Sequence, residues 1–136
     1  MAAISSVMSV PPTSPRPAVF VVDDDPAVRT ALERLFRGAG WTVRTFATAE
    51  EFLQEDLHLA RGCLVADVHL GRMSGLELHA TLGDRAGAMA VILTTGVDDV
   101  NMELEAFRLG AIAFFRKPFE PGDLLESVRR GLAAVG

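Results

Sequence analysis

The fold is decided by residues 18–26, which read AVFVVDDDP. Residues 18–22 are a continuous run that favours β-structure, and such a run predicts a strand buried on both faces of a sheet. Asp25 and Pro26 then combine an N-cap residue with proline at the first helical position, so a helix is predicted directly after the strand. The stretch therefore predicts the first strand and helix of an α/β protein.

The same alternation of short apolar runs and amphipathic stretches continues along the chain. Further strands are predicted at 41–46, 63–66, 90–93 and 111–115. The intervening helices are predicted to begin at the capping boxes Thr48-x-x-Glu51 and Ser74-x-x-Glu77 and at Asp99, and a last helix carries Leu124, Leu125, Val128 and Leu132. Five strands that alternate with five helices imply right-handed crossovers and a doubly wound, flavodoxin-like parallel sheet with strand order 2-1-3-4-5.

Length and composition set limits on the function. The chain has 136 residues, of which 49% are hydrophobic, and this suits one domain. Residues 1–17 contain four prolines within 11–17 and predict a disordered N-terminal tail, so the domain is expected to span 18–134. The net charge of -5 argues against direct contact with nucleic acid, and no apolar run is long enough for a membrane span. The lone cysteine, Cys63, fits a reducing compartment, so a cytoplasmic location is expected.

Polar side chains stand where the predicted strands end. Asp23 and Asp24 follow the first strand, Asp67 follows the third, Thr95 ends the fourth, and Lys117 follows the fifth. In a sheet of this kind, ligands bind at the carboxyl ends of the strands, beside the point where the strand order reverses. We therefore expect these five side chains to converge.

The expected group of carboxylates needs positive charge. Two carboxylates about 4 Å apart repel each other by about 4 kcal/mol at an effective dielectric constant near 20, so three of them require protons or a cation. Oxygen ligands without His or Cys favour a hard divalent ion, and a sparse set with room for water favours Mg²⁺. Lys117, the one lysine of the chain, would add an ammonium, and Thr95 a hydroxyl. Together these groups suit a transferring phosphoryl group.

Taken in order, these motifs resemble the receiver domain of two-component response regulators. They are Val21-Val22-Asp23-Asp24-Asp25, Asp67 with Met73-Ser74-Gly75 behind it, Thr95-Gly96, and Lys117-Pro118-Phe119, and the resemblance covers about residues 18–134. It implies that Asp67 accepts phosphate from a phosphohistidine on a sensor histidine kinase or a phosphotransfer protein, in a Mg²⁺-dependent phosphorelay reaction. The domain would then be a phosphoacceptor that dephosphorylates itself and not a turnover enzyme.

The resemblance also implies a role for each site residue. Asp24 would ligate Mg²⁺ directly and Asp23 through water, while Asp67 and the main-chain carbonyl of His69 would complete the protein ligands. Lys117 would pair with the phosphoryl group and precede a cis peptide bond to Pro118.

A conformational switch is implied as well. Thr95 would bond a phosphoryl oxygen, and Phe114 would turn inward as Thr95 moves. This change would reshape the surface formed by the helix after Asp99, the strand 111–115 and the last helix. That surface would form a homodimer or grip a partner.

The sequence departs from the family pattern at Gly71, where a proline usually stands four residues after the acceptor. Because glycine admits more backbone states, a more flexible loop is expected there. His69 and Val97 occupy the positions that tune phosphoryl lifetime in the family. Val97 would shield the site from water, whereas His69 would either block a water molecule or position one.

Other functions stay open at this point. Asp23-x-Asp25 resembles the catalytic pair of haloacid-dehalogenase phosphohydrolases, but Ala27 stands where that family wants Thr or Val, and Asp67 would be idle. A second alternative is an interaction module that is never phosphorylated. Both a stand-alone receiver and the N-terminal part of a longer regulator fit the chain. Outside the site, His58 and His79 are expected to be solvated helix residues.

Overall fold

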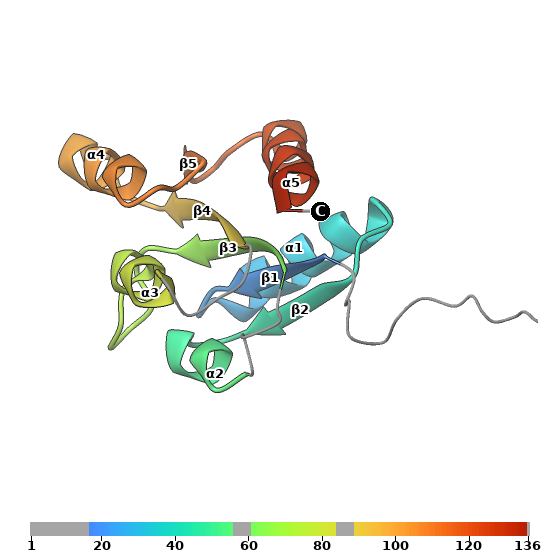
Figure 1. Cartoon of the computed structure of the whole chain (residues 1–136), viewed down its shortest axis with the longest axis horizontal. Coiled ribbons are helices and arrows are strands. Elements are labelled where there is room, and N and C mark those ends of the chain that lie inside the picture. The colour runs from blue at the N-terminus through green and yellow to red at the C-terminus, as the bar shows by residue number, and fades with distance from the viewer. Residues whose placement is uncertain (1–16, 56–60, 84–88, 136) are drawn as a thin grey trace, which may run out of the picture.

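The structure of the chain is a computed structural model that describes residues 17–55, 61–83 and 89–135. These residues form one parallel sheet in the predicted order β2-β1-β3-β4-β5 (Figure 1). The strands are β1 (Ala18–Val22), β2 (Val43–Phe46), β3 (Gly62–Asp67), β4 (Met89–Thr95) and β5 (Ala113–Arg116). The helices are α1 (Pro26–Gly38), α2 (Ala49–Leu53), α3 (Gly75–Leu82), α4 (Val100–Arg108) and α5 (Pro121–Val135). The tail predicted for residues 1–17 lies outside the described residues, apart from Pro17.

The central strands bring the site residues to one edge of the sheet. Every residue of β1 and β3 is buried, as expected for strands covered by helices on both faces. The register pairs Val22 with Ala66 and Asp67 with Thr94. The carboxyl ends of β1, β3 and β4 therefore lie side by side.

Two helical layers enclose the sheet. Figure 1 shows α2, α3 and α4 on one face and α1 and α5 on the other. Phe52, Leu78 and Ala106 belong to the first of the two resulting cores, and Phe36 and Leu124 to the second. None of the described helices combines the length and apolar character that a membrane crossing requires.

The first four helices begin where their caps are predicted. Asp25, Thr48, Ser74 and Asp99 each accept a hydrogen bond from a backbone N–H in the first turn of the following helix. Ser74 and Glu77 form the reciprocal capping box. Each cap fixes the point at which the chain turns away from the edge of the sheet that carries the polar side chains.

The edge strands begin later than predicted. β2 begins at Val43 and not at residue 41, because the N–H of Trp41 donates to Phe36 O at 3.2 Å. β5 begins two residues later than predicted, because the N–H of Ala111 donates to Ala106 O at 3.0 Å. In both places the chain still satisfies carbonyl groups at the end of the preceding helix before it joins the sheet.

His79 is buried, contrary to the expectation of a solvated residue. It lies on the inner stripe of α3 with Gly75, Leu78 and Leu82, which is the i, i+3, i+4, i+7 spacing of a buried face. Among the described residues its Nδ1 has no hydrogen-bond partner, and burial lowers the pKa of its imidazole. The other histidine of that expectation, His58, lies outside the described residues.

Candidate functional site

Three aspartates with three different environments follow β1. Asp23 is 2% exposed, and its Oδ1 accepts a hydrogen bond from the N–H of Asp25 at 2.9 Å. Asp24 is exposed. Asp25 caps α1 by accepting a hydrogen bond from the N–H of Ala27 at 2.9 Å. Asp23 and Asp24, but not Asp25, belong to the group of carboxylates that includes Asp67, so the structure separates the helix cap from the candidate site.

Asp67 is the last residue of β3 and is 8% exposed. Its Oδ1 accepts a hydrogen bond from the N–H of His69 at 2.8 Å. The backbone around it is tightly packed, since the N–H of Val68 donates to Thr94 O at 2.8 Å and the N–H of Gly75 donates to Val68 O at 2.8 Å. A Cβ on Gly75 would lie only 2.4 Å from Asp67 O. The start of α3 therefore rests directly on the backbone of Asp67.

Lys117 joins the aspartates of the two strands. Its Nζ donates to Asp23 Oδ2 at 2.9 Å and to Asp67 Oδ2 at 2.8 Å. The N–H of Lys117 donates to Thr95 O at 2.7 Å, and the peptide bond to Pro118 is cis, as the resemblance implies. Lys117 lies 94 positions after Asp23 and 50 positions after Asp67 in the chain, so the fold brings together residues that are far apart in sequence.

The charges of this group are not balanced. Burial raises the pKa of the Asp23 carboxyl, although the N–H of Asp25 and the ammonium of Lys117 oppose the shift. Burial acts to lower the pKa of Lys117, but its hydrogen bonds to Asp67 and Asp23 outweigh burial and raise that pKa above its usual value. The ammonium therefore stays charged at neutral pH. It is one positive charge beside the carboxylates of Asp23, Asp24 and Asp67.

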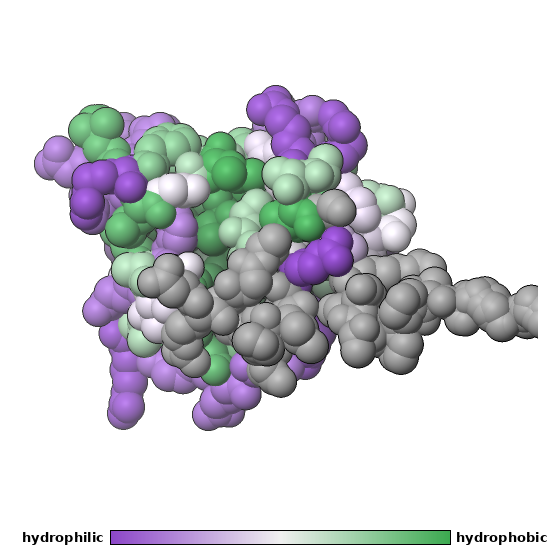
Figure 2. Space-filling view, viewed as in Figure 1, coloured by the Kyte–Doolittle hydropathy of each residue, from purple (hydrophilic) through white to green (hydrophobic). Residues whose placement is uncertain are grey.

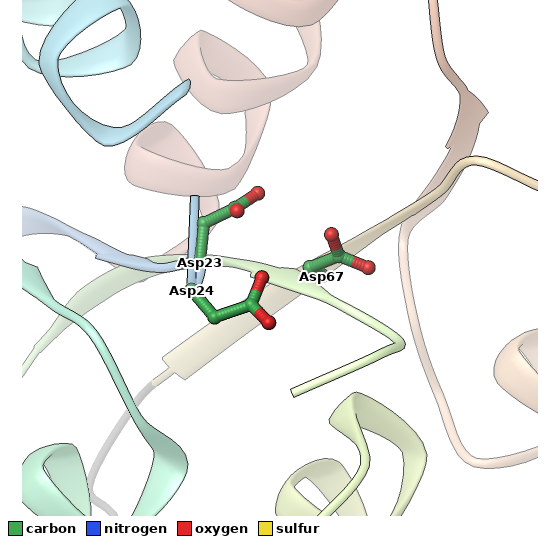
Figure 3. A group of neighbouring side chains, drawn as sticks. All are labelled: Asp23, Asp24 and Asp67. Atoms are coloured by element: carbon green, nitrogen blue, oxygen red, sulfur yellow. The ribbon is translucent and has the colours of Figure 1, made fainter. Parts of the chain in front are cut away.

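The donor set fits a hard divalent cation. Asp23, Asp24 and Asp67 can each offer one oxygen, and these three oxygens lie within 4.8 Å of one another. Figure 3 shows Asp23 and Asp24 at the end of β1 with their carboxylates turned apart, and Asp67 beside them. A small set of carboxylate oxygens, one of them exposed to solvent, suits Mg²⁺, which retains several water ligands when it binds to proteins.

Thr95 and Phe114 lie near this edge but make other contacts. Thr95 ends β4 and is fully buried, and its Oγ1 accepts a hydrogen bond from the N–H of Val97 at 3.2 Å. Phe114 is half-buried in β5, packs against the core beneath α4, and lines a hollow of about 170 Å³ together with Val97 and Arg116. Within the described part of the chain, neither side chain is hydrogen-bonded to Asp67.

The loop after Asp67 explains the departure at Gly71. Gly71 has φ +80°, a left-handed conformation that proline cannot adopt because its ring fixes φ near −65°. His69 is exposed beside the acceptor. The glycine thus serves a specific backbone turn in this loop.

Two features of the site were missed from the sequence. Nη1 of Arg29 donates to the main-chain carbonyl of Asp23 at 2.7 Å. The only signal of this contact in the sequence is a basic residue one helical turn after the cap Asp25.

The second feature is an apolar groove of about 370 Å³ beside Lys117, and its other lining residues are Val28, Ala31, Leu32, Leu35, Pro118, Phe119 and Pro121. The i, i+4, i+7 spacing of Val28, Leu32 and Leu35 signals an apolar stripe, but not that part of it stays open.

The comparison with protein families decides what this arrangement is. The model of the response regulator receiver domain matches residues 19–129. The chain belongs to the response regulator receiver domain family. This receiver domain is therefore a signalling module of two-component systems, as the motifs at the strand ends predicted.

Individual relatives agree with this family. The receiver is 43% identical over 114 residues to the transcriptional regulatory protein FixJ of Azorhizobium caulinodans, covering 84% of this chain and 54% of FixJ. It is 40% identical over 114 residues to the response regulator protein TmoT of Ectopseudomonas mendocina, covering 84% of this chain and 52% of TmoT. The receiver spans about half the length of these curated relatives.

A solved structure confirms the fold. The crystal structure of FixJ-N is similar with a TM-score of 0.81 and 34% sequence identity, and the match covers 90% of this receiver and 98% of that chain. The five-stranded, doubly wound sheet that the sequence predicted is thus the fold of a receiver domain.

Proposed function

We propose that this receiver, spanning residues 18–134, is a phosphorylation-controlled switch in which Asp67 accepts a phosphoryl group from a phosphohistidine donor. The ammonium of Lys117, hydrogen-bonded to both Asp67 and Asp23, is the observation that carries the proposal. A phosphoryl group attached to Asp67 would arrive beside this ammonium, which can then donate to the phosphoryl oxygens.

The transfer needs little covalent chemistry from the protein. A carboxylate oxygen of Asp67 forms a bond to phosphorus while the bond from phosphorus to the histidine nitrogen of the donor breaks. The leaving imidazole keeps the electron pair and takes a proton from solvent, and Asp67 becomes an acyl phosphate. The N–H of His69, which donates to Asp67 Oδ1, orients the nucleophile. Lys117 stabilises the charge on the transferred group.

Asp23, Asp24 and Asp67 would hold Mg²⁺ together with the main-chain carbonyl of His69. Asp24 would be a direct ligand, and Asp23 would act through water. The bound ion would offset the negative charge that phosphoryl oxygens bring to a site already rich in carboxylates.

Thr95 and Phe114 would transmit the change. The hydroxyl of Thr95 would exchange its hydrogen bond from the N–H of Val97 for one to a phosphoryl oxygen, and Phe114 would move inward. The half-buried position of Phe114 supports this movement, because its ring packs against the core and also lines a hollow whose other residues include Asp98 and Arg116. An inward movement would take the ring from this largely polar hollow toward apolar contacts.

The phosphodonor would be a sensor histidine kinase or a phosphotransfer protein, and we propose that the two proteins meet in the cytoplasm. The apolar groove between α1 and the segment after β5 supports docking at this end of the sheet. Lys117 lines the groove and also contacts Asp67. A donor seated there would bring its phosphohistidine to the acceptor.

Phosphate uptake tests the proposal directly. Incubation of the full chain with a small-molecule phosphodonor and Mg²⁺ should add one phosphoryl group, measured by intact mass. Asp67→Asn should stay unmodified. Asp25→Asn is the matched control, because asparagine still caps α1, and this variant should gain phosphate as the wild type does.

The control variant also separates the alternatives. A chain that stays unmodified, or an Asp67→Asn variant that is modified like the wild type, contradicts the proposal. A haloacid-dehalogenase type phosphohydrolase would lose activity in Asp25→Asn, whereas Asp25 caps a helix here and Asp67 is bound to Lys117. An interaction module without phosphorylation would bind no Mg²⁺.

We propose further that phosphorylation promotes a homodimer through the surface of α4, β5 and α5. Val100, Leu104 and Phe107 are 65%, 62% and 45% exposed and share one face of α4, and Ile112 is 46% exposed next to β5. Figure 2 shows apolar surface in the region of α4 and β5, bordered by hydrophilic side chains. An exposed apolar patch with a polar border is typical of a protein interface.

Leu104→Arg is expected to prevent this dimer. A charge at the centre of an apolar interface would be desolvated without a partner, so the dimer should dissociate at least tenfold more readily. Sedimentation with a phosphoryl mimic bound measures the mass of the assembly. Thr30→Arg adds the same charge to an exposed position of α1 and should leave the dimer intact; a wild-type mass that does not change with the mimic contradicts the proposal.

A further inference from the structure

The contact between Arg29 and Asp23 has no role in the function proposed so far. Arg29 lies one turn into α1, and its N–H donates to the main-chain carbonyl of Asp25 at 3.0 Å. Its guanidinium donates to the main-chain carbonyl of Asp23 at 2.7 Å. Within the described residues Arg29 forms no ion pair. This cation beside an acidic site therefore contacts the backbone and not a carboxylate.

The contact completes the fixation of Asp23. The N–H of Asp23 donates to Phe46 O at 3.1 Å, and its carbonyl accepts from Arg29. One carboxylate oxygen accepts from the N–H of Asp25 and the other from Lys117. Four polar atoms of this buried residue thus each have a hydrogen-bond partner, and among the described residues the partner of the carbonyl is Arg29.

Asp24 has no such fixation of its side chain. Its carboxylate is exposed and accepts no hydrogen bond from any residue that the structure describes, yet it lies within reach of the other two carboxylates (Figure 3). No described side-chain contact directs the Asp24 carboxylate, so its backbone, which sets the direction of its Cα–Cβ bond, decides where the carboxylate can reach. The peptide group that joins Asp23 to Asp24 carries the carbonyl that Arg29 holds.

We propose that Arg29 is a positioning residue of the Mg²⁺ site. By holding the carbonyl of Asp23, it fixes the plane of the Asp23–Asp24 peptide and so directs the Asp24 carboxylate toward the ion. The inference rests on the proposed Mg²⁺-dependent function. It concerns only how the chain prepares Asp24 before the ion binds.

Whether replacing Arg29 weakens or tightens Mg²⁺ binding distinguishes a positioning role from a purely electrostatic one. Arg29 is a positive charge near a cation site, so by charge alone its removal would tighten Mg²⁺ binding. Loss of positioning weakens binding instead, because Asp24 must then be ordered at the moment of binding. Opposite signs make the two explanations separable by one measurement.

The experiment is a calorimetric titration of the unphosphorylated full chain with Mg²⁺. Arg29→Met removes the donor and the charge and is expected to weaken binding by about fivefold to tenfold. Arg29→Lys keeps a charged donor of similar reach and should restore most of the affinity. Arg34→Met removes an exposed arginine of the same helix and should bind within about twofold of the wild type. Unchanged or tighter binding by Arg29→Met overturns the proposal.

A measurement without metal gives an independent readout. In the Mg²⁺-free protein, amide hydrogen exchange at Asp24 should be faster in Arg29→Met than in wild type, and Arg29→Lys should slow it again; equal exchange in all three overturns the proposal. If urea unfolding shows that Arg29→Met does not fold, Arg29→Gln, whose side chain is too short to reach the carbonyl, takes its place.

Asp24→Asn separates this inference from the function on which it rests. If Asp24→Asn binds Mg²⁺ as the wild type does, the proposed metal site is wrong and the inference falls with it. If Asp24→Asn loses affinity while Arg29→Met keeps it, the metal site stands and only the positioning role of Arg29 is overturned.

Discussion

Replacing Lys117 by methionine is expected to lower the free energy of unfolding at neutral pH by about 2 to 4 kcal/mol. The side chains of Asp23 and Asp67 are only 3% and 10% exposed, and the ammonium is the cation that both contact, at 2.9 and 2.8 Å. Its removal leaves two buried carboxylates that repel each other. The upper end of the range for a broken buried ion pair is not expected, because the Lys117 side chain is 23% exposed and water can partly replace it.

Urea unfolding of matched variants checks this prediction. Arg116→Met removes the neighbouring cation, whose side chain is 60% exposed and which faces Asp98 at 3.4 Å, so its effect should stay within about 0.5 kcal/mol. Adding Asp23→Asn to Lys117→Met should restore more than half of the lost stability, because one of the two repelling charges is removed. If Arg116→Met lost as much free energy of unfolding as Lys117→Met, the loss could not be attributed to the buried contacts of Lys117 with Asp23 and Asp67.

The wild type and Lys117→Met are expected to differ in free energy of unfolding by an amount that depends on pH. This dependence follows from the pKa shifts of Lys117 and Asp23. Lys117 has a raised pKa, so its stabilising contribution is complete below the ordinary value of 10.5 and is lost as pH rises through the raised value. Asp23 also has a raised pKa, so protonation in the folded state adds stability that is complete below 3.8 and is lost as pH rises through its folded value.

The difference in free energy of unfolding between wild type and Lys117→Met should therefore be largest near neutral pH. At alkaline pH the wild type loses the charge of Lys117 and approaches the variant. At acidic pH the variant takes up a proton on Asp23, more readily than the wild type because no ammonium opposes it, and regains stability. Unfolding free energies measured from acidic to alkaline pH would show a maximum of the difference between these limits, and a difference independent of pH would contradict the assignment.

The convergence of Asp23, Asp67 and Lys117 could be predicted from the sequence because topology alone imposes it. Each residue lies at the end of an apolar run or within two residues of it, and the carboxyl ends of parallel strands meet at one edge of the sheet. Asp23 and Asp67 follow the neighbouring strands β1 and β3, whereas β5, which precedes Lys117, lies two strands from β3, so the length of the lysine side chain completes the contact. Long separations in sequence did not matter, since right-handed crossovers allow few other arrangements. The same reasoning predicts Thr95 at this edge, whereas Phe114 is implied only by the resemblance to the receiver family, and the proposed roles of both stay predictions.

The features that could not be predicted depend on contacts with backbone atoms or on local backbone angles. Arg29 reaches a carbonyl, and no pattern of side chains marks which carbonyl a long arginine will meet. The φ of +80° at Gly71 is a local backbone angle that no sequence pattern marks, and the greater flexibility expected of its loop stays a prediction. His79 is expected from the sequence to be a solvated helix residue, but its i−4 and i+3 spacing from Gly75 and Leu82 places it on the buried stripe of α3.

Gly75→Ala is expected to destabilise the receiver by about 2 to 3 kcal/mol and to slow phosphorylation of Asp67 by at least about tenfold. The added Cβ would lie 2.4 Å from Asp67 O and 3.0 Å from both Asp67 C and Val68 Cα. All three are backbone atoms, so no side chain can move aside to make room. Either α3 or the end of β3 must shift, and β3 carries the acceptor.

Gly122→Ala is the matched control, because Gly122 also lies in the first turn of a helix, α5, but has nothing within 4 Å of its added Cβ. There the change should be neutral or should stabilise the fold by about 0.5 to 1 kcal/mol. Phosphorylation of this variant by a small-molecule donor should proceed at the wild-type rate.

The two effects of Gly75→Ala can be separated by measuring the rate at a temperature where urea unfolding shows that the variant is folded. A lower population of folded protein then no longer explains slow phosphorylation, and what remains is displacement of Asp67 relative to Lys117. Such a displacement lengthens a contact of 2.8 Å, and a misplacement of about 1 Å is enough to cost a large factor in rate. If the folded variant is phosphorylated at the wild-type rate, the close packing of α3 on β3 stabilises the fold without positioning the acceptor.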